Sequence, residues 1–310
     1  MNLPSKVILC EVGLRDGLQN EKACLAFEDK LTLARAIIAA GCRVVELGSF
    51  VSPKAVPQMA DTDALFQALG QENGVELRAL IANPKGVERA AACGCKKVKL
   101  NVSASRAHNI ANLNMTPEES VAKFADCCAI ARDCGVAVSG SISMPFGSPW
   151  EKDIPVGDVQ RIIEAYLSVG IEEISLSDTS GMAVPNQVYA LCTLVQKEYS
   201  QACWWLHLHN TRGVAMANII AAMQAGITGF DTSLAGLGGC PFVPGAAGNI
   251  ATEDVVHMLS EMHVETGVDI HRALDAARLF KTLVAHDTDS YLLRAGCSRD
   301  LALELPRRKA

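Results

Sequence analysis

The chain has 310 residues, of which 49% are hydrophobic and 20% charged, so it can bury a large core, and disorder is excluded as its main state. Its formal net charge is −6, and without an excess of basic residues we expect no nucleic-acid partner. Twelve cysteines are too few for a disulfide scaffold of this length, and no apolar run is long enough to span a bilayer. The first residues also lack a secretory pattern, so we expect a cytoplasmic protein with reduced thiols and no membrane partner.

Short β-branched runs alternate along the chain with longer segments of helical periodicity. The expected strands are Val7–Val12, Arg43–Leu47, Leu77–Ala82, Lys97–Val102, Val136–Ser143, Glu173–Ser177, Trp204–His209 and Gly229–Ser233. The expected helices are Phe27–Ala40, Val56–Gly70, Lys85–Cys93, Pro117–Cys134, Val156–Val169, Asn186–Tyr199 and Val214–Ala225. This alternation predicts a (β/α)8 TIM barrel, with residues 1–310 as one catalytic domain and a helical C-terminal extension over about 270–310. The alternative is an open doubly wound sheet, but the phosphate-binding G-x-G-x-x-G is missing after the first strand.

Polar side chains gather where the expected strands end, which is where a TIM barrel carries its catalytic residues. His207 and His209 lie two apart on one strand, so both imidazoles point to the same face. With Asp16 as a carboxylate ligand and Asn249 as an amide ligand, they could bind Mg²⁺, Mn²⁺, Co²⁺ or Zn²⁺. Alternatively, the two histidines merely pack beneath a loop. The acidic residues at neighbouring strand ends favour the metal site.

Four further residues at these strand ends have both a catalytic and a structural interpretation. Arg15 could stabilise an oxyanion beside the metal or form a surface ion pair with Asp16. Asp178 could be catalytic or could cap the following helix. Cys240 lies in a glycine-dense stretch, where its thiol could act as an acid or base or be an ordinary small residue. Glu46 could orient Arg15 or a metal-bound water, and we expect a supporting role.

Several blocks from about Val7 to Asp275 closely resemble the 3-hydroxy-3-methylglutaryl-CoA lyase family of the DRE-TIM metallolyase superfamily. These blocks, in the order of the chain, begin with Arg15-Asp16-Gly17-Leu18-Gln19-Asn20-Glu21, Ser49-Phe50-Val51-Ser52-Pro53-Lys54 and Val56-Pro57-Gln58-Met59. They continue with Ala235-Gly236-Leu237-Gly238-Gly239-Cys240-Pro241 and Gly248-Asn249-Ile250-Ala251-Thr252-Glu253-Asp254. Departures from the family pattern occur at Ser143–Ser148 and at Asn210, near the substrate end of the barrel.

The resemblance implies which residues do the chemistry. The implied metal ligands are Asp16, His207, His209 and Asn249, and the implied catalytic residues are Arg15, Asp16, Glu46, Asp178, His207 and Cys240. It further implies a divalent cation, Mg²⁺ or Mn²⁺, and a homodimer. The expected reaction is a retro-Claisen cleavage of 3-hydroxy-3-methylglutaryl-CoA, an acyl-CoA, to acetyl-CoA and acetoacetate.

Other functions fit the same residues. One alternative is a lyase for another 3-hydroxy-3-substituted acyl-CoA, and others are a Claisen-type synthase or an aldolase. A metal-binding barrel without catalysis is disfavoured, because it has no need for all these polar groups together.

Overall fold

The computed structural model describes residues 2–70, 74–239, 247–284 and 287–301. Eight parallel strands follow one another around a closed barrel, and the first strand pairs with the eighth to complete it. They are β1 (Ile8–Glu11), β2 (Val44–Ser49), β3 (Glu76–Ile81), β4 (Lys97–Ser103), β5 (Ala137–Ser143), β6 (Glu173–Asp178), β7 (Cys203–Leu208) and β8 (Gly229–Thr232). The TIM barrel prediction is confirmed, and the open doubly wound sheet is excluded.

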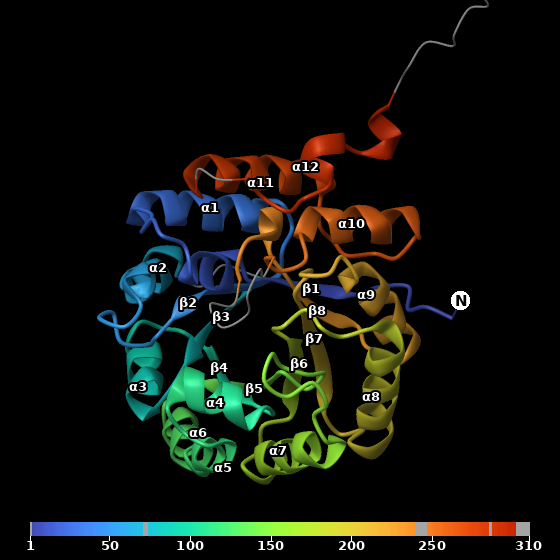
Figure 1. Ribbon diagram of the computed structural model, residues 1–310. Coiled ribbons are helices and arrows are strands. Elements are labelled where there is room, and N and C mark those ends of the chain that lie inside the picture. Colours follow the sequence, from blue (N-terminus) through green and yellow to red (C-terminus); the bar gives the residue numbers. More distant parts are fainter. Residues whose placement is uncertain (1, 71–73, 240–246, 285–286, 302–310) are drawn as a thin grey trace, which may run out of the picture.

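Helices surround the strands on the outside of the barrel (Figure 1). They are α1 (Phe27–Ala39), α2 (Thr62–Leu69), α3 (Pro84–Ala92), α4 (Arg106–Leu113), α5 (Pro117–Ala122), α6 (Phe124–Asp133), α7 (Val156–Ser168), α8 (Pro185–Glu198), α9 (Ala215–Gln224), α10 (Thr252–Glu261), α11 (Ile270–Val284) and α12 (Leu292–Ala295). The C-terminal α11 packs against α1 and α10, so a helical extension follows the barrel as expected, while residues 302–310 lie outside the described part.

Several helix predictions were wrong in detail. The single helix expected over Pro117–Cys134 is two helices. They are separated at Lys123, whose N–H donates to the carbonyl of Ser120, three residues earlier, at 3.1 Å. The helix expected from Val56 begins only at Thr62, after a short 3₁₀ turn. Two helices, α4 and α10, were not among those expected from the sequence.

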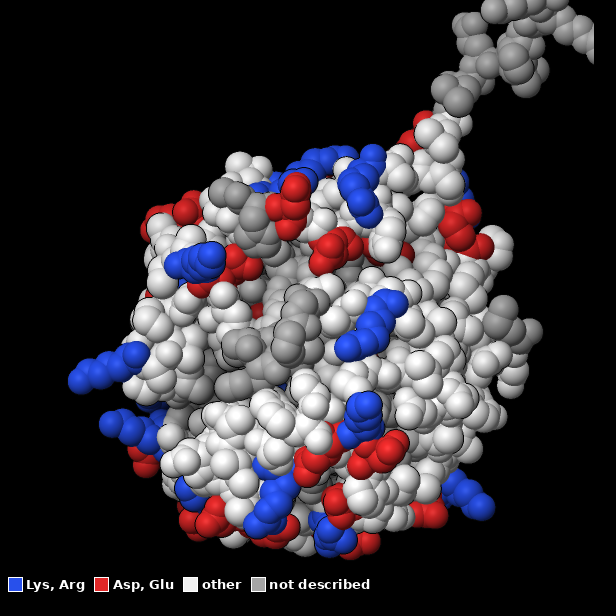
Figure 2. Space-filling model, in the orientation of Figure 1, with Lys and Arg blue, Asp and Glu red and all other residues white. Residues whose placement is uncertain are grey.

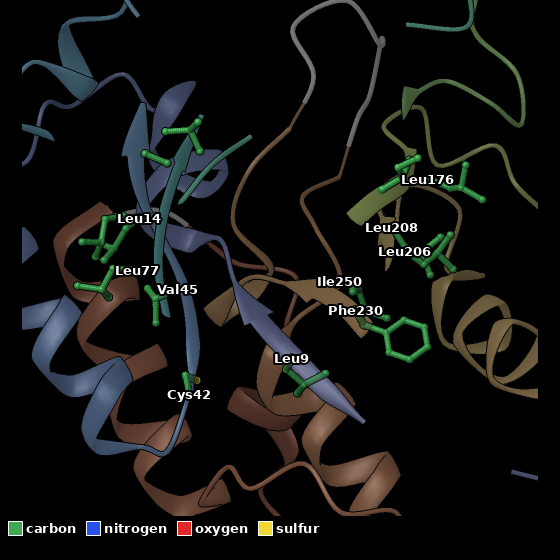
Figure 3. Packing of buried hydrophobic residues seen from close by; sticks show 14 of the residues in the cluster. Leu9, Leu14, Cys42, Val45, Leu77, Leu176, Leu206, Leu208, Phe230 and Ile250 are labelled. Carbon is green, nitrogen blue, oxygen red and sulfur yellow. The ribbon is translucent and has the colours of Figure 1, made fainter. Parts of the chain in front are cut away.

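The strands bury two kinds of side chain on their two faces, because successive residues of a strand point to opposite sides. One set of alternating residues is apolar and packs between barrel and helices, for example Leu176, Leu206, Leu208 and Phe230 (Figure 3). The other set points toward the barrel axis and is largely polar, with Lys99 and His207 among its buried members. The apolar core therefore lies between the strands and the helices, and the inside of the barrel carries polar groups.

Figure 2 shows the molecule in the orientation of Figure 1, with a hollow near the centre of the surface. Acidic and basic side chains are interspersed around this hollow. None of the helices in the described ranges is long and apolar enough to cross a membrane. Every cysteine within those ranges is a free thiol.

Candidate active site

Arg15 and Asp16 lie on a single π-helical turn, Gly13–Gly17, that follows β1. The carboxylate of Glu11, the last residue of that strand, is fully buried and accepts a hydrogen bond from the Gly13 N–H at 2.9 Å. A Cβ at Gly13 would lie only 2.6 Å from this carboxylate, so the close approach requires glycine. The turn is thus fixed at the carboxyl end of the barrel, where the other strands bring their polar residues.

Asp16, His207 and His209 form a compact cluster whose potential ligand atoms all lie within 4.8 Å of one another. The two Nε2 atoms are 3.1 Å apart, and Oδ2 of Asp16 lies 3.8 Å from that of His207 and 3.6 Å from that of His209. A divalent cation binds nitrogen and oxygen ligands at about 2.0–2.2 Å, which places neighbouring ligand atoms about 3 Å apart. The spacing of these side chains therefore fits a shared cation.

Asn249 joins this cluster from the far end of the chain. Its Nδ2 donates to Oδ2 of Asp16 at 2.7 Å and to the carbonyl of Leu237 at 2.9 Å. Its Oδ1 is buried and has no hydrogen-bond partner within the described ranges. A buried carbonyl oxygen without a donor is unusual and here fits a fourth cation ligand.

Two members of the cluster, Asp16 and His209, have shifted pKa values that favour their unprotonated forms. Burial raises the pKa of Asp16, but Arg15 and the two histidines lower it more, so its pKa lies below its usual range. Burial, with a contribution from His207, lowers the pKa of His209 to about 4. Near neutral pH Asp16 is a carboxylate and His209 a neutral imidazole, which are the forms that bind a cation.

Arg15 is held by two carboxylates and is not a surface residue. Its Nε donates to Oε1 of Glu46, and its terminal nitrogen donates to Oδ1 of Asp16. Arg15 is 9% exposed and Glu46 fully buried, so the interpretation as a solvated surface pair was wrong. The contact with Glu46 fits the expected supporting role, and together the two carboxylates hold the guanidinium next to the cluster.

Two buried residues that the sequence analysis missed connect Glu46 to His207. Lys99 Nζ, on β4, donates to Oε2 of Glu46 at 2.9 Å and to Oδ2 of Asp231 at 3.1 Å. The same Asp231 oxygen lies 3.3 Å from Nδ1 of His207. The sequence could have pointed to Lys99 and Asp231, because each is a charged residue within a buried strand and such a residue needs a partner of opposite charge.

Asp178, at the end of β6, is engaged by the loop that follows it. Its Oδ1 accepts from Ser180 Oγ at 3.1 Å and from the Met182 N–H at 3.0 Å, and its Oδ2 accepts from the Ala183 N–H at 3.0 Å. Asp178 therefore does not cap α8, whose N-cap is Val184, and the structural interpretation as a helix cap was wrong; its carboxylate instead binds the loop before that helix. Its catalytic role stays a prediction. Cys240 lies outside the described residues.

A cavity of about 140 Å³ opens over the cluster and extends into the barrel. Beyond Arg15, Asp16 and the histidines it is lined by Gln19, Asn20, Leu80, Lys99, Asn101, His108, Asn112, Ser141, Ser143, Ser177, Thr179, Asp231 and Gly239. The cavity is large enough for a small acyl group beside the cluster.

Fold and site together define a TIM-barrel enzyme with a candidate cation centre at the carboxyl ends of its strands. A family model described as HMGL-like matches residues 6–280, and the chain belongs to this family of carbon–carbon lyases. It is 40% identical over 278 residues to hydroxymethylglutaryl-CoA lyase YngG of Bacillus subtilis, covering 90% of this chain and 93% of that protein. It is also 40% identical to a 3-hydroxy-3-isohexenylglutaryl-CoA/hydroxy-methylglutaryl-CoA lyase of Pseudomonas aeruginosa, over 95% of this chain and 98% of that one. A solved HMG-CoA lyase of Acinetobacter baumannii, in complex with coenzyme A and 3-methylmalate, superposes with a TM-score of 0.92 at 37% identity, covering 99% of this chain and all of that one.

Proposed function

We propose that this lyase cleaves 3-hydroxy-3-methylglutaryl-CoA to acetyl-CoA and acetoacetate. The observation that carries the proposal is the cluster of Asp16, His207 and His209 with the Arg15 guanidinium beside it. The hydroxymethylglutaryl-CoA lyases to which the chain is similar over nearly its whole length support the same reaction.

Asp16, His207, His209 and Asn249 would hold a divalent cation, Mg²⁺ or Mn²⁺ by preference. Their spacing, the unpartnered Asn249 Oδ1 and the mixed nitrogen and oxygen donors fit such an ion. The bound cation supplies Lewis-acid chemistry, which lowers the pKa of the substrate C3 hydroxyl and orients it.

The reaction removes the proton of the C3 hydroxyl, breaks the C2–C3 bond and leaves the electron pair on the thioester fragment as an enolate. Protonation at C2 then gives acetyl-CoA, and the remaining ketone is acetoacetate. Arg15 would pair with the enolate oxygen, a role supported by the two carboxylates of Glu46 and Asp16 that hold its guanidinium. Glu46 would be a positioning residue, since it acts through the Arg15 guanidinium that it holds.

The proton transfers are assigned to a small set of groups. The base is Asp16 or one of the two histidines, and the acid that returns a proton to C2 is Cys240 or His207. We propose Asp178 as a residue that shapes the loop at the rim of the site.

Purified protein is tested with 3-hydroxy-3-methylglutaryl-CoA after chelation, with and without Mg²⁺ or Mn²⁺. We expect metal-dependent release of acetyl-CoA and acetoacetate in equal amounts. Arg15→Gln should lower kcat by orders of magnitude while metal content stays unchanged. A near-normal kcat would remove Arg15 from its assigned role, and no cleavage by metal-loaded protein would refute the proposed reaction.

A second candidate function is cleavage of a related acyl-CoA with another group on C3. It is favoured by the name of the Pseudomonas relative, which includes the 3-isohexenyl substrate, and by the position of Ser143 on the cavity wall within a stretch that departs from the family pattern. The same assay with 3-hydroxyglutaryl-CoA thioesters that carry other groups on C3, including the isohexenyl group, tests this function directly.

We further propose a cytoplasmic homodimer that binds an acyl-CoA as its small-molecule partner. The free thiols of the described residues fit a reducing compartment. Light scattering on the purified protein measures the mass in solution and thereby tests the dimer.

A further inference from the structure

The cavity of about 140 Å³ over the cluster, which we call the acyl cavity, has a largely polar lining. Most small-molecule pockets are instead lined mainly by apolar side chains. Among the lining residues that the structure describes, Leu80 is the single aliphatic side chain. The wall formed by β4, β5 and β6 carries a lysine, an asparagine and three serines: Lys99, Asn101, Ser141, Ser143 and Ser177. In the closed barrel, β4 and β5 lie across from β8 and β1, and β1 leads into the turn that carries Asp16. A substrate held at the cation cluster therefore faces this wall.

The hydrogen bonds within the wall leave donors available. Ser143 Oγ donates to Oδ1 of Asn101 at 2.8 Å, which orients the amide and leaves its Nδ2 without a partner in the described residues. Ser141 Oγ and Ser177 Oγ are 2.9 Å apart, so one hydroxyl donates to the other and the second keeps its proton for another acceptor. Lys99 uses two of its three N–H groups on Glu46 and Asp231.

A wall of this kind matches a ligand that brings acceptor oxygens. A methyl group cannot accept any of these hydrogen bonds, and it would displace water from them without replacing the contacts, which weakens binding. The free carboxylate of the glutaryl chain can take up some donors, but every 3-hydroxyglutaryl-CoA substrate carries it. The group that differs between substrates is the substituent on C3.

We propose that this lyase prefers substrates whose C3 substituent carries an oxygen, such as hydroxymethyl or carboxymethyl, over those with a plain alkyl group. This inference rests on the proposed function, because it specifies the substrate of the same site. Asn101 is the specificity-determining residue, since it lines the cavity and its Oδ1 is held by Ser143, which leaves the two N–H groups of its amide for a ligand.

The test compares kcat/KM for four coenzyme A thioesters of 3-hydroxyglutarate, substituted at C3 with methyl, isohexenyl, hydroxymethyl or carboxymethyl. We expect at least one oxygen-bearing substrate to exceed the methyl substrate by about 10-fold or more, because sites built to hydrogen-bond a substrate discriminate strongly against analogues that lack the group. The hydroxymethyl and carboxymethyl arms separate a neutral from an anionic substituent. If the methyl or the isohexenyl substrate is the best of the four, the inference is overturned while the proposed function stands. If none is cleaved, the proposed function itself fails.

A pair of variants ties the preference to the wall. Asn101→Leu should reduce the ratio of kcat/KM between the oxygen-bearing and methyl substrates by about 10-fold, which a general loss of stability would not do. Ser139→Ala is the matched control, because Ser139 lies deeper on β5, donates to the Val98 carbonyl at 3.3 Å and does not line the cavity. An unchanged ratio in Asn101→Leu would overturn the assignment of Asn101.

Discussion

Lys99 gives the sharpest test of the polar network beneath the site. Substitution by Met keeps an unbranched apolar stem but removes the ammonium group from between Glu46 and Asp231, at 2.9 and 3.1 Å. Both carboxylates are almost completely buried, at 0% and 2% exposed. Removing one partner from a buried ion pair leaves an uncompensated charge, which costs about 3–5 kcal/mol. We therefore expect Lys99→Met to lower the free energy of unfolding by about this amount.

The same substitution should weaken the cation site, although Lys99 contacts none of the proposed ligands directly. Lys99 holds Asp231, and Asp231 lies against Nδ1 of His207. Residues that orient a metal-binding histidine in this way typically contribute about 10–100-fold to metal affinity or activity. We expect a loss of that size in Mn²⁺ affinity, measured by calorimetry, together with a lower kcat.

Lys97→Met is the matched control for this experiment. Lys97 lies on the same strand and pairs with two carboxylates, at 3.1 Å from Glu76 and 2.6 Å from Glu173, and it does not line the acyl cavity. It should reduce stability without changing Mn²⁺ affinity. If Lys99→Met is as stable as the wild type and binds Mn²⁺ equally well, the network does not support the site as we describe it.

Three further predictions follow from individual contacts. His209→Ala should reduce bound metal in elemental analysis, and unchanged content would remove His209 from the ligand set. Burial raises the pKa of Glu253 from its ordinary value of 4.5 to about 8 in the folded chain. The unfolded chain therefore loses this proton more readily than the folded chain, and the folded state becomes less stable as the pH rises from 4.5 to 8. Glu253→Gln should therefore gain in Tm relative to wild type between pH 5 and 9, and a pH-independent difference in melting scans would contradict the reasoning. Gly248→Ala should reduce kcat by about 100-fold or more, because the new Cβ would lie 1.6 Å from the Gly236 carbonyl oxygen and force apart the segments that present Asn249. Normal steady-state kinetics would refute this.

The positions of the strands could be predicted because most of them carry a local run of β-branched residues, and β7 a run of aromatic and aliphatic ones, and neither pattern depends on distant residues. Helices without a strong apolar stripe were harder to detect. The helix α4 starts after a capping serine, Ser105, whose side chain accepts from the His108 N–H at 3.2 Å, yet half of its eight residues are polar. A local periodicity test misses such a helix because it is stabilised by its cap and by packing against β4.

The proposed cation ligands were found in the sequence because histidines two apart on a strand are a local signal. The support beneath them was not found, since Lys99 and Asp231 are 132 residues apart and meet only when the barrel closes. Asp178 shows the opposite case: an acidic residue at a strand end has the same appearance in the sequence whether it faces the substrate or, as its contacts show, the loop behind it.

The hydrogen bond between Asn249 and Asp16 joins residues 233 positions apart. Asp16 follows the first strand and Asn249 the last, and β1 and β8 form the seam at which the barrel closes. A cation bound by the segments that follow the first and the last strand would stabilise the closed barrel more than any open intermediate, because binding favours the state that has the complete site. Contacts so distant in sequence form late and slowly during folding. The complete set of four proposed ligands would then exist only once the barrel has closed, so full metal affinity would report that final closure.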